Sequence, residues 1–411
     1  MELDTGLLLC AMLVLALLLQ PLAARLGLPF PSLLLLAGFA GSELLLALGQ
    51  DTGLRAEGFH DLIFYIFLPV LVFAAAFSID ARALARNLLP ILVLALPVML
   101  LSTLVTAALV YFGIGHPRGF PWIAALLTGA LLSATDPAAA TALFRALGVP
   151  ERLVVLFEGE SLFNDALAIV LFGLLLGLAL NPDRSPDLGL AGREFGRVFA
   201  GGILTGLAGG LLFLVLARWR CSDTPALQGL VTLIAAYSSY LLAESLLGVS
   251  GVMAVLVCGL ILGRLAGDNA EPAGRQFLQH LWQLNAYVAG ALVFLLMGAT
   301  VTLAMFGERW LAMLIGVAGV LAARALGIFG IVPLASLLPG VERITLGQQA
   351  CLAWGGLRGA VALALALSLP VELEYWWTIQ SIAFGVVLFS LLVQAPSIPP
   401  LIRRLGLAKR G

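Results

Sequence analysis

Long apolar runs dominate the chain, and short segments rich in charged residues, glycine and proline separate them. A helix needs about 20 mostly apolar residues to cross the hydrocarbon core of a bilayer, where its backbone groups must be hydrogen-bonded within the segment. The pattern therefore predicts an all-α polytopic membrane protein with about 13 transmembrane helices. The predicted helices cover residues 6–22, 29–49, 59–79, 88–113, 121–147, 153–180, 195–217, 226–247, 249–266, 283–306, 310–336, 345–370 and 375–402.

Charges between the runs predict the orientation of the chain. Arg and Lys in short loops prefer the cytoplasmic side of a membrane. If the N-terminus lies outside, most of them fall in loops predicted to be cytoplasmic, including the cluster at residues 403–410. An odd number of helices then leaves the C-terminus in the cytoplasm. Glu2 and Asp4 stand where a signal peptide carries basic residues, so we interpret the first run as a retained membrane helix.

Composition narrows the classes of function. Of 411 residues, 61% are hydrophobic and 11% are charged, and the mean hydropathy is +1.07. Soluble domains carry about 25% charged residues, so an ordinary soluble enzyme is excluded. The net charge of −1 provides no basic field for nucleic acid. The four cysteines form no CxxC pair, and we expect them to be small buried hydrophobic residues rather than metal ligands.

A faint internal similarity relates two parts of the chain. Residues 71–73 and 292–294, in the third and tenth runs, both read Leu-Val-Phe. The fifth and twelfth runs both have small residues at their centres and end in proline, at Pro150 and Pro370. Each pair is seven helices apart, so the two copies would have opposite orientations in the membrane. Inverted repeats with interrupted helices are typical of secondary transporters.

Charged residues at membrane depth are the strongest candidates for function, because a charge at the bilayer centre costs about 2.5–3.5 kcal/mol on insertion scales. Asp136 stands before Pro137, midway through the fifth run. Proline removes a backbone donor and disfavours helical geometry at the preceding residue, so we expect the helix to break near Thr135. The freed carbonyl groups need partners, and a desolvated cation is one. The alternative is a plain proline kink.

The sixth run contains a second group of polar residues. Ser161 and Asp165 are four residues apart and share one helix face, and Glu160 and Asn164 share a neighbouring face. The short connection between the fifth and sixth runs makes these helices antiparallel, which brings Asp165 and the carboxylate of the fifth run to a similar depth. Carboxylate and hydroxyl oxygens, with Thr135, suit an alkali cation such as Na⁺ and offer nothing to soft metals.

Proton chemistry follows from the same burial. Removal from water and a second carboxylate both favour the protonated form of a carboxyl group. A cation favours the ionised form, so a proton and a cation compete for Asp136 and Asp165. If the loaded site faces one side of the membrane at a time, this competition is sufficient for exchange. The alternative for Asp165 is a structural hydrogen bond, for example to Asn164.

Arg358 lies among Gly355, Gly356 and Gly359 in the twelfth run, a sequence that favours a second broken helix. A buried guanidinium requires a partner, and Glu160 is the leading candidate. Arg324 either shares this carboxylate or extends to the membrane interface.

The segments Thr135-Asp136-Pro137 and Phe157 to Asp165 resemble those of the monovalent cation/proton antiporter-1 family, especially its prokaryotic NhaP-type sodium/proton antiporters. Residues 250–254 and 355–361 also look like family segments. The resemblance covers nearly the whole chain. It implies a homodimer in the prokaryotic inner or plasma membrane whose protomers work by an elevator-like movement. It also implies a mobile core over residues 88–180 and 310–402, and a dimerisation scaffold over 6–79 and 195–306.

The resemblance also implies roles for individual residues. The fifth and twelfth helices would cross, unwound, at the ion site, and no cofactor beyond the transported ions would be required. The implied cation and proton ligands are Thr135, Asp136, Ser161 and Asp165. The implied supporting polar cluster is Glu160, Asn164, Arg358 and Arg324, and Glu158 is a candidate for the ion pathway. An Asn-Asp pair at residues 164–165 is similar to that of electroneutral members, in line with an amide that cannot titrate.

Two features leave alternatives open. Ala74 stands where the family often has an acidic residue in its third helix, so Li⁺ or K⁺ could replace Na⁺ as the substrate. Gly248 to Gly251 match the GxSG string of intramembrane serine hydrolases, but His60, His116 and His280 all fall near loops, and such a serine needs a base at membrane depth. A cation channel would need no competition with protons. We therefore expect a transporter and not an enzyme.

Overall fold

The computed structural model describes residues 2–26, 28–49, 61–114, 119–181, 188–220, 224–266, 272–335 and 342–408. Within these ranges the regular structure is helical, with ten helices long and apolar enough to cross a membrane and three shorter apolar helices. They coincide with the predicted runs, so the predicted all-α polytopic architecture is confirmed. The tenth helix begins at Pro272 instead of residue 283. The apolar pattern did not include its first turns, because they carry the exposed polar residues Gln276, Gln279 and His280.

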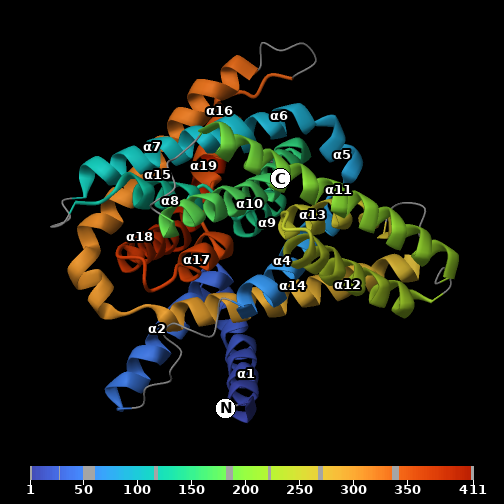
Figure 1. The fold of residues 1–411 in the computed structure, drawn as a ribbon, viewed down its shortest axis with the longest axis horizontal. Helices are drawn as coiled ribbons and strands as arrows, with labels where there is room; N and C mark the ends of the chain where they lie inside the picture. The colour runs from blue at the N-terminus through green and yellow to red at the C-terminus, as the bar shows by residue number, and fades with distance from the viewer. Residues whose placement is uncertain are drawn as a thin grey trace.

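One group of helices comes from the first part and the middle of the chain. Helix α14 packs against α2 and α4, and α13 packs against α4, α11 and α12 (Figure 1). The approach of α2 to α14 is very close, because a Cβ on Gly298 would overlap the carbonyl of Leu35. The members are α1 (Glu2–Leu26), α2 (Phe30–Ala47), η1 (Leu62–Phe67), α4 (Leu68–Ser78), α11 (Leu188–Arg220), α12 (Pro225–Leu241), η3 (Leu242–Leu246), α13 (Gly251–Leu262), η4 (Gly263–Ala266) and α14 (Pro272–Thr300).

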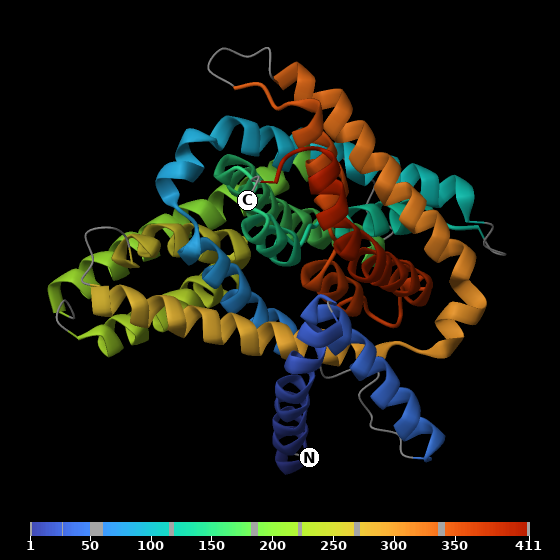
Figure 2. The same cartoon turned by 180° about the vertical axis from the view of Figure 1, so that it is seen from behind.

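Helix α1 packs against α2 and α14. It projects from the other helices in two opposite views (Figures 1 and 2). Cys10 lies on this helix and is exposed, so the expectation of buried cysteines is wrong there, whereas Cys258 and Cys351 are buried. Cys221 lies outside the described residues.

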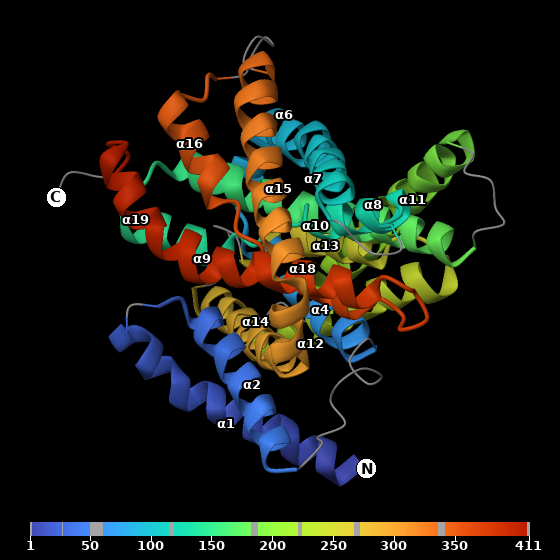
Figure 3. The ribbon, with the colours of Figure 1, turned by 90° about the vertical axis from the view of Figure 1, so that its left-hand side faces the viewer.

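The second group of helices contains the two interrupted ones. Helix α15 packs against α7 and α18, and α8 packs against α7 and α10 (Figure 3). The members are α5 (Ala81–Arg86), α6 (Leu88–Val93), η2 (Leu94–Val98), α7 (Met99–Gly113), α8 (Trp122–Leu131), α9 (Ala138–Ala146), α10 (Glu151–Leu180), α15 (Leu303–Ala335), α16 (Leu346–Gly355), α17 (Ala360–Leu367), α18 (Trp376–Phe389), η5 (Ser390–Gln394) and α19 (Ala395–Arg404).

A single large hydrophobic cluster joins the two groups, with Phe73 and Val293 from the first and Ala130 and Leu365 from the second. The expected division into a core over residues 88–180 and 310–402 and a scaffold over 6–79 and 195–306 stays a prediction. Movement of one group against the other stays a prediction.

Two helices are broken in mid-membrane, as the sequence predicts. The chain leaves helical geometry between α8 and α9, at residues 132–137, and again between α16 and α17, at residues 356–359. The breaks touch, because the backbone N–H of Asp136 donates a hydrogen bond of 2.8 Å to the carbonyl of Leu357. The prediction that these helices cross at their unwound centres is confirmed.

Candidate functional site

The break after α8 leaves carbonyl groups outside the helical hydrogen-bond pattern, and three of them accept hydrogen bonds from side chains elsewhere in the chain. The guanidinium of Arg358 donates from Nη1 to the carbonyl oxygens of Ser133 and Ala134, at 3.1 Å and 3.0 Å. The hydroxyl of Ser161 on α10 donates to the carbonyl of Thr135. Because unsatisfied backbone groups are very costly inside a membrane, these bonds stabilise the unwound segment.

This arrangement corrects the expected partner of Arg358. Its side chain is buried, but its hydrogen bonds go to backbone carbonyls and not to the carboxylate of Glu160. The physical reason is the break itself: the carbonyls of Ser133 and Ala134 lie in the unwound segment after α8, where backbone oxygens need a donor from elsewhere. The sequence indicated a buried cation that requires a partner, but it could not distinguish a carboxylate from backbone carbonyls.

Arg324 is the residue that pairs with Glu160. Its Nη1 and Nη2 donate to the two carboxylate oxygens, with 2.9 Å between Nη2 and Oε2. Nη2 and Nε also donate to the carbonyl of Leu352 near the end of α16, at 3.0 Å and 3.3 Å. Arg324 and Glu160 are 3% and 1% exposed, so the alternative in which Arg324 extends to the membrane interface is wrong. The pair joins α10, α15 and α16.

Asn164 completes this polar cluster. Its amide Nδ2 donates to Glu160 Oε1 over 3.2 Å, one helical turn away on α10. The amide oxygen of Asn164 is buried without a hydrogen-bond partner among the described residues. The residues expected to form the supporting cluster, Glu160, Asn164, Arg324 and Arg358, therefore lie around the two breaks, with Glu160 paired to Arg324 and not to Arg358.

Asp165 and Asp136 lie at the crossing itself. Asp165 follows Ser161 by one turn of α10, its carboxylate accepts a hydrogen bond from the backbone of Thr135, and the charges of Asp136 and Arg358 act on it. Its Oδ1 atom is buried and has no hydrogen-bond partner within the described part of the chain. The four predicted ligands, Thr135, Asp136, Ser161 and Asp165, therefore converge.

The second break also shapes the environment of Asp136. A Cβ on Gly359 would overlap the Asp136 carboxylate, so only glycine allows this approach without a shift. Asp136 thus lies at the start of α17, which begins at Ala360, and just before α9, which begins at Ala138. Helix N-termini carry partial positive charge, which stabilises a carboxylate. The site therefore offers carboxylate and hydroxyl oxygens to a monovalent cation or a proton, while the helix ends and two arginines compensate charge.

Glu158 lies apart from this cluster. Its carboxylate pairs with Arg145 of α9 over 2.6 Å, and its side chain is 20% exposed. It is therefore a carboxylate near the edge of the bundle rather than a member of the buried polar cluster, and its role in an ion pathway stays a prediction.

The structure places the two features that left alternatives open, Ala74 for the substrate ion and Ser250 for a serine hydrolase. Ala74 is buried in α4 within the large hydrophobic cluster. The Ser250 hydroxyl accepts a hydrogen bond of 3.2 Å from the N–H of Met253, which makes it the N-cap of α13. His280 is exposed, and His60 and His116 lie outside the described residues.

Gln394 is a polar residue that the sequence reasoning missed. It is 3% exposed, and its Nε2 donates to the carbonyl of Trp354 near the end of α16 over 3.2 Å. The available signal was an amide in an otherwise apolar span, but the search for charged residues passed over it.

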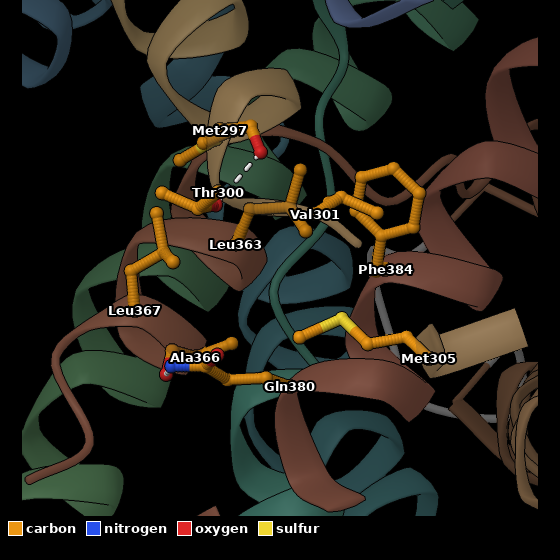
Figure 4. A pocket seen from close by; sticks show the side chains of 9 residues that line it. All are labelled: Met297, Thr300, Val301, Met305, Leu363, Ala366, Leu367, Gln380 and Phe384. Atoms are coloured by element: carbon orange, nitrogen blue, oxygen red, sulfur yellow. Dashed lines mark hydrogen bonds between the residues drawn. The ribbon is translucent and has the colours of Figure 1, made fainter. Parts of the chain in front are cut away.

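A small cavity lies away from the carboxylates, where α14, α17 and α18 meet (Figure 4). Gln380 is one of its few polar groups, and its amide donates to the carbonyl of Ala366. The lining residues are Met297, Thr300, Val301, Met305, Leu363, Ala366, Leu367, Gln380 and Phe384.

Comparison with known proteins identifies the family of this chain. The family model for sodium/hydrogen exchangers, transmembrane, matches residues 11–404. The Na(+)/H(+) antiporter NhaP of Pseudomonas aeruginosa is 34% identical over 359 residues, which cover 86% of this chain and 83% of that protein. The Na(+)/H(+) antiporter ApNhaP of Aphanothece halophytica is 38% identical over 348 residues.

The same fold occurs in a solved structure. The sodium proton antiporter MjNhaP1 from Methanocaldococcus jannaschii superposes with a TM-score of 0.81 at 22% identity, over 98% of this chain and 99% of that one.

The match to ApNhaP covers 84% of this chain but 65% of ApNhaP, so the chain spans slightly less than two thirds of that relative's length.

Proposed function

Because the chain belongs to the family of transmembrane sodium/hydrogen exchangers, we propose that it exchanges Na⁺ for H⁺ across the membrane. The observation that carries the proposal is the buried Oδ1 of Asp165, which has no hydrogen-bond partner among the described residues and lies beside a second carboxylate at the crossing of two broken helices. A bound proton or a bound cation would each give that oxygen the partner it lacks.

The proposed cation ligands are oxygens of Asp136, Asp165, Thr135 and Ser161. The hydroxyl of Ser161 donates its single proton to the Thr135 carbonyl, which leaves its lone pairs directed elsewhere and free to coordinate a cation. Oxygen ligands suit hard alkali cations. Na⁺ binding favours the ionised form of the carboxylates, so the ion and the proton exclude each other.

Charge balance favours exchange of about one proton for one Na⁺. Asn164 does not titrate. Glu160 makes a two-pronged ion pair with Arg324, so its carboxylate oxygens are engaged within the protein and not by the transported cation. The remaining titratable groups of the site are the two aspartates that share the cation.

Transport also requires that the site face each side of the membrane in turn. The group with the two interrupted helices carries every proposed ligand, on α10 and in the break between α8 and α9, and we call it the core. The other group, which includes α2, α4 and α11–α14, is the scaffold. We propose that the core moves against this scaffold, that two protomers associate, and that the protein resides in a prokaryotic plasma membrane with its C-terminus in the cytoplasm.

Na⁺ is the proposed substrate because relatives such as ApNhaP and NhaP bear the name Na(+)/H(+) antiporter. The test uses proteoliposomes with a trapped pH indicator, to which Na⁺, Li⁺ or K⁺ is added side by side. We expect Na⁺ to change the internal pH in wild-type vesicles and not in Asp165→Asn vesicles.

A control comes from a carboxylate that the proposed site does not use, near the end of the span Pro225–Leu246. Glu244 accepts a hydrogen bond of 2.9 Å from the N–H of Gly251, far from the proposed ligands in the fold, and a Gln there keeps the acceptor oxygen. Glu244→Gln vesicles should therefore exchange like wild type. Undiminished exchange by Asp165→Asn would refute the proposed site, and a response to K⁺ alone would refute Na⁺ as the substrate.

A further inference from the structure

A π-helical turn interrupts the last membrane span at η5 (Ser390–Gln394), and the proposed ion site does not account for its polar residues. Gln394 is buried, and both ends of its amide are in use. Its oxygen accepts from the Ser390 hydroxyl over 2.8 Å, and its nitrogen donates to the Trp354 carbonyl over 3.2 Å.

Trp354 lies one residue before the end of α16, at the edge of the second break. The last four carbonyls of a helix have no partner within it, and at membrane depth each needs another donor. Arg324 supplies donors to Leu352, the N–H of Leu357 supplies one to Gly355, and Gln394 supplies the donor to Trp354. A side chain of the last membrane span, that of Gln394, therefore helps to fix the position of the end of α16.

The position of the end of α16 matters for the ion site, because Leu357 and Arg358, which follow it, are hydrogen-bonded to the break between α8 and α9. The carbonyl of Leu357 accepts from the N–H of Asp136, and the Arg358 guanidinium donates to the carbonyls of Ser133 and Ala134. A displacement of the end of α16 would move both groups relative to Asp136.

The turn itself is held from further directions. The Trp354 indole donates to the Ser397 hydroxyl over 2.8 Å, and that hydroxyl donates to the carbonyl of Gln394 over 2.7 Å. From the other helix group, the hydroxyl of Ser32 on α2 donates to the carbonyl of Leu391 over 3.1 Å. Because these bonds hold η5 in place, the Gln394 amide donates from a fixed position.

We propose that Gln394 is a positioning residue for cation binding: by holding the Trp354 carbonyl, it sets where α16 ends and so aligns the two breaks around Asp136. This inference rests on the proposed exchange function. Loss of the amide should therefore raise the Na⁺ concentration needed for half-maximal exchange more than it lowers the maximal exchange rate.

The test measures the initial rate of Na⁺-driven proton movement in proteoliposomes as a function of Na⁺ concentration at fixed pH. Gln394→Met keeps the approximate shape and removes the donor. We expect its half-saturating Na⁺ concentration to rise about five- to tenfold, as loss of one buried hydrogen bond implies, with the maximal rate within about twofold. A role in folding alone would lower the amount of active protein, and so the maximal rate, without moving half-saturation.

Gln349→Met is the matched control. Gln349 is also buried on α16, and its amide also donates to a backbone carbonyl, that of Ile344 at 2.8 Å, but at the opposite end of the helix. Its half-saturating concentration should stay near the wild-type value. An equal rise in Gln349→Met would overturn the proposal.

Ser390→Ala provides a milder perturbation that tests the proposal even where Gln394→Met does not fold. It removes the hydroxyl that orients the Gln394 amide, and we expect a smaller rise in the same direction. Unchanged half-saturation in Ser390→Ala, and in Gln394→Met where that variant folds, would overturn the proposal. A wild-type protein that exchanges no Na⁺ would instead refute the proposed function itself.

Discussion

Replacing Arg324 by methionine removes the cation that pairs with Glu160 deep inside the helix bundle. The substitution keeps a long side chain and deletes every donor of the guanidinium. It leaves the Glu160 carboxylate buried with the amide of Asn164 as its remaining hydrogen-bond donor, and it removes both donors to the Leu352 carbonyl. We expect a large loss of stability.

The magnitude follows from burial. Breaking a buried ion pair by removing one partner costs about 3–5 kcal/mol, and an unsatisfied buried carbonyl adds about 1–3 kcal/mol. In the double variant Arg324→Met/Glu160→Gln no uncompensated charge remains, so most of the ion-pair part of the loss should return. Arg145→Met is the matched control, because its partner Glu158 is 20% exposed and Arg145 is 54% exposed; such a pair contributes about 0–1 kcal/mol.

The assay is thermal unfolding of the purified protein in one detergent, with equal loading and a common heating rate. We expect the order wild type, then Arg145→Met close below it, then the double variant, and Arg324→Met lowest. A melting temperature of Arg324→Met equal to that of Arg145→Met would refute the assignment of the buried pair. So would a double variant no more stable than the single one.

Three further outcomes are expected. Arg358→Met removes the guanidinium donors to the carbonyls of Ser133 and Ala134, so the free energy of unfolding in detergent should fall by about 1–3 kcal/mol and the exchange rate should fall. Wild-type stability of this variant would contradict the role of Arg358. Gly359→Ala places a methyl group on the Asp136 carboxylate, so the exchange rate in proteoliposomes should fall, whereas Gly290→Ala, which meets open space, should match wild type. With K⁺ and valinomycin clamping the voltage, the rate of Na⁺/H⁺ exchange should not depend on membrane potential, and a systematic dependence would contradict exchange of one proton for one Na⁺.

The broken helices could be predicted because their causes are local. Pro137 removes a donor and restricts the residue before it, and glycines surround Arg358, so the sequence itself marks both interruptions. Convergence of Asp136 and Asp165 was also predictable, because a short connection makes their helices antiparallel. The four proposed ligands follow from these two facts.

The partners of the two arginines could not be predicted. Arg324 and Arg358 are both buried cations near one carboxylate, and the choice depends on which carbonyls lie nearest to each guanidinium. That geometry exists only after α8, α15 and α16 have packed. Gln394 is a similar case, because its partner is a backbone carbonyl, and no side chain in the sequence indicates which helix end it meets.

The central claim is that Na⁺ and a proton compete for the carboxylates Asp136 and Asp165. The most direct test is the affinity of the purified protein for Na⁺, measured by calorimetry at a series of pH values. Competition with one proton predicts that the apparent Kd rises as pH falls, by about tenfold for each pH unit once the site is mostly protonated, and that about one proton is released for each Na⁺ bound. A Kd for Na⁺ that stays constant across the pH range in which the protein remains folded, with no proton release, would contradict the account.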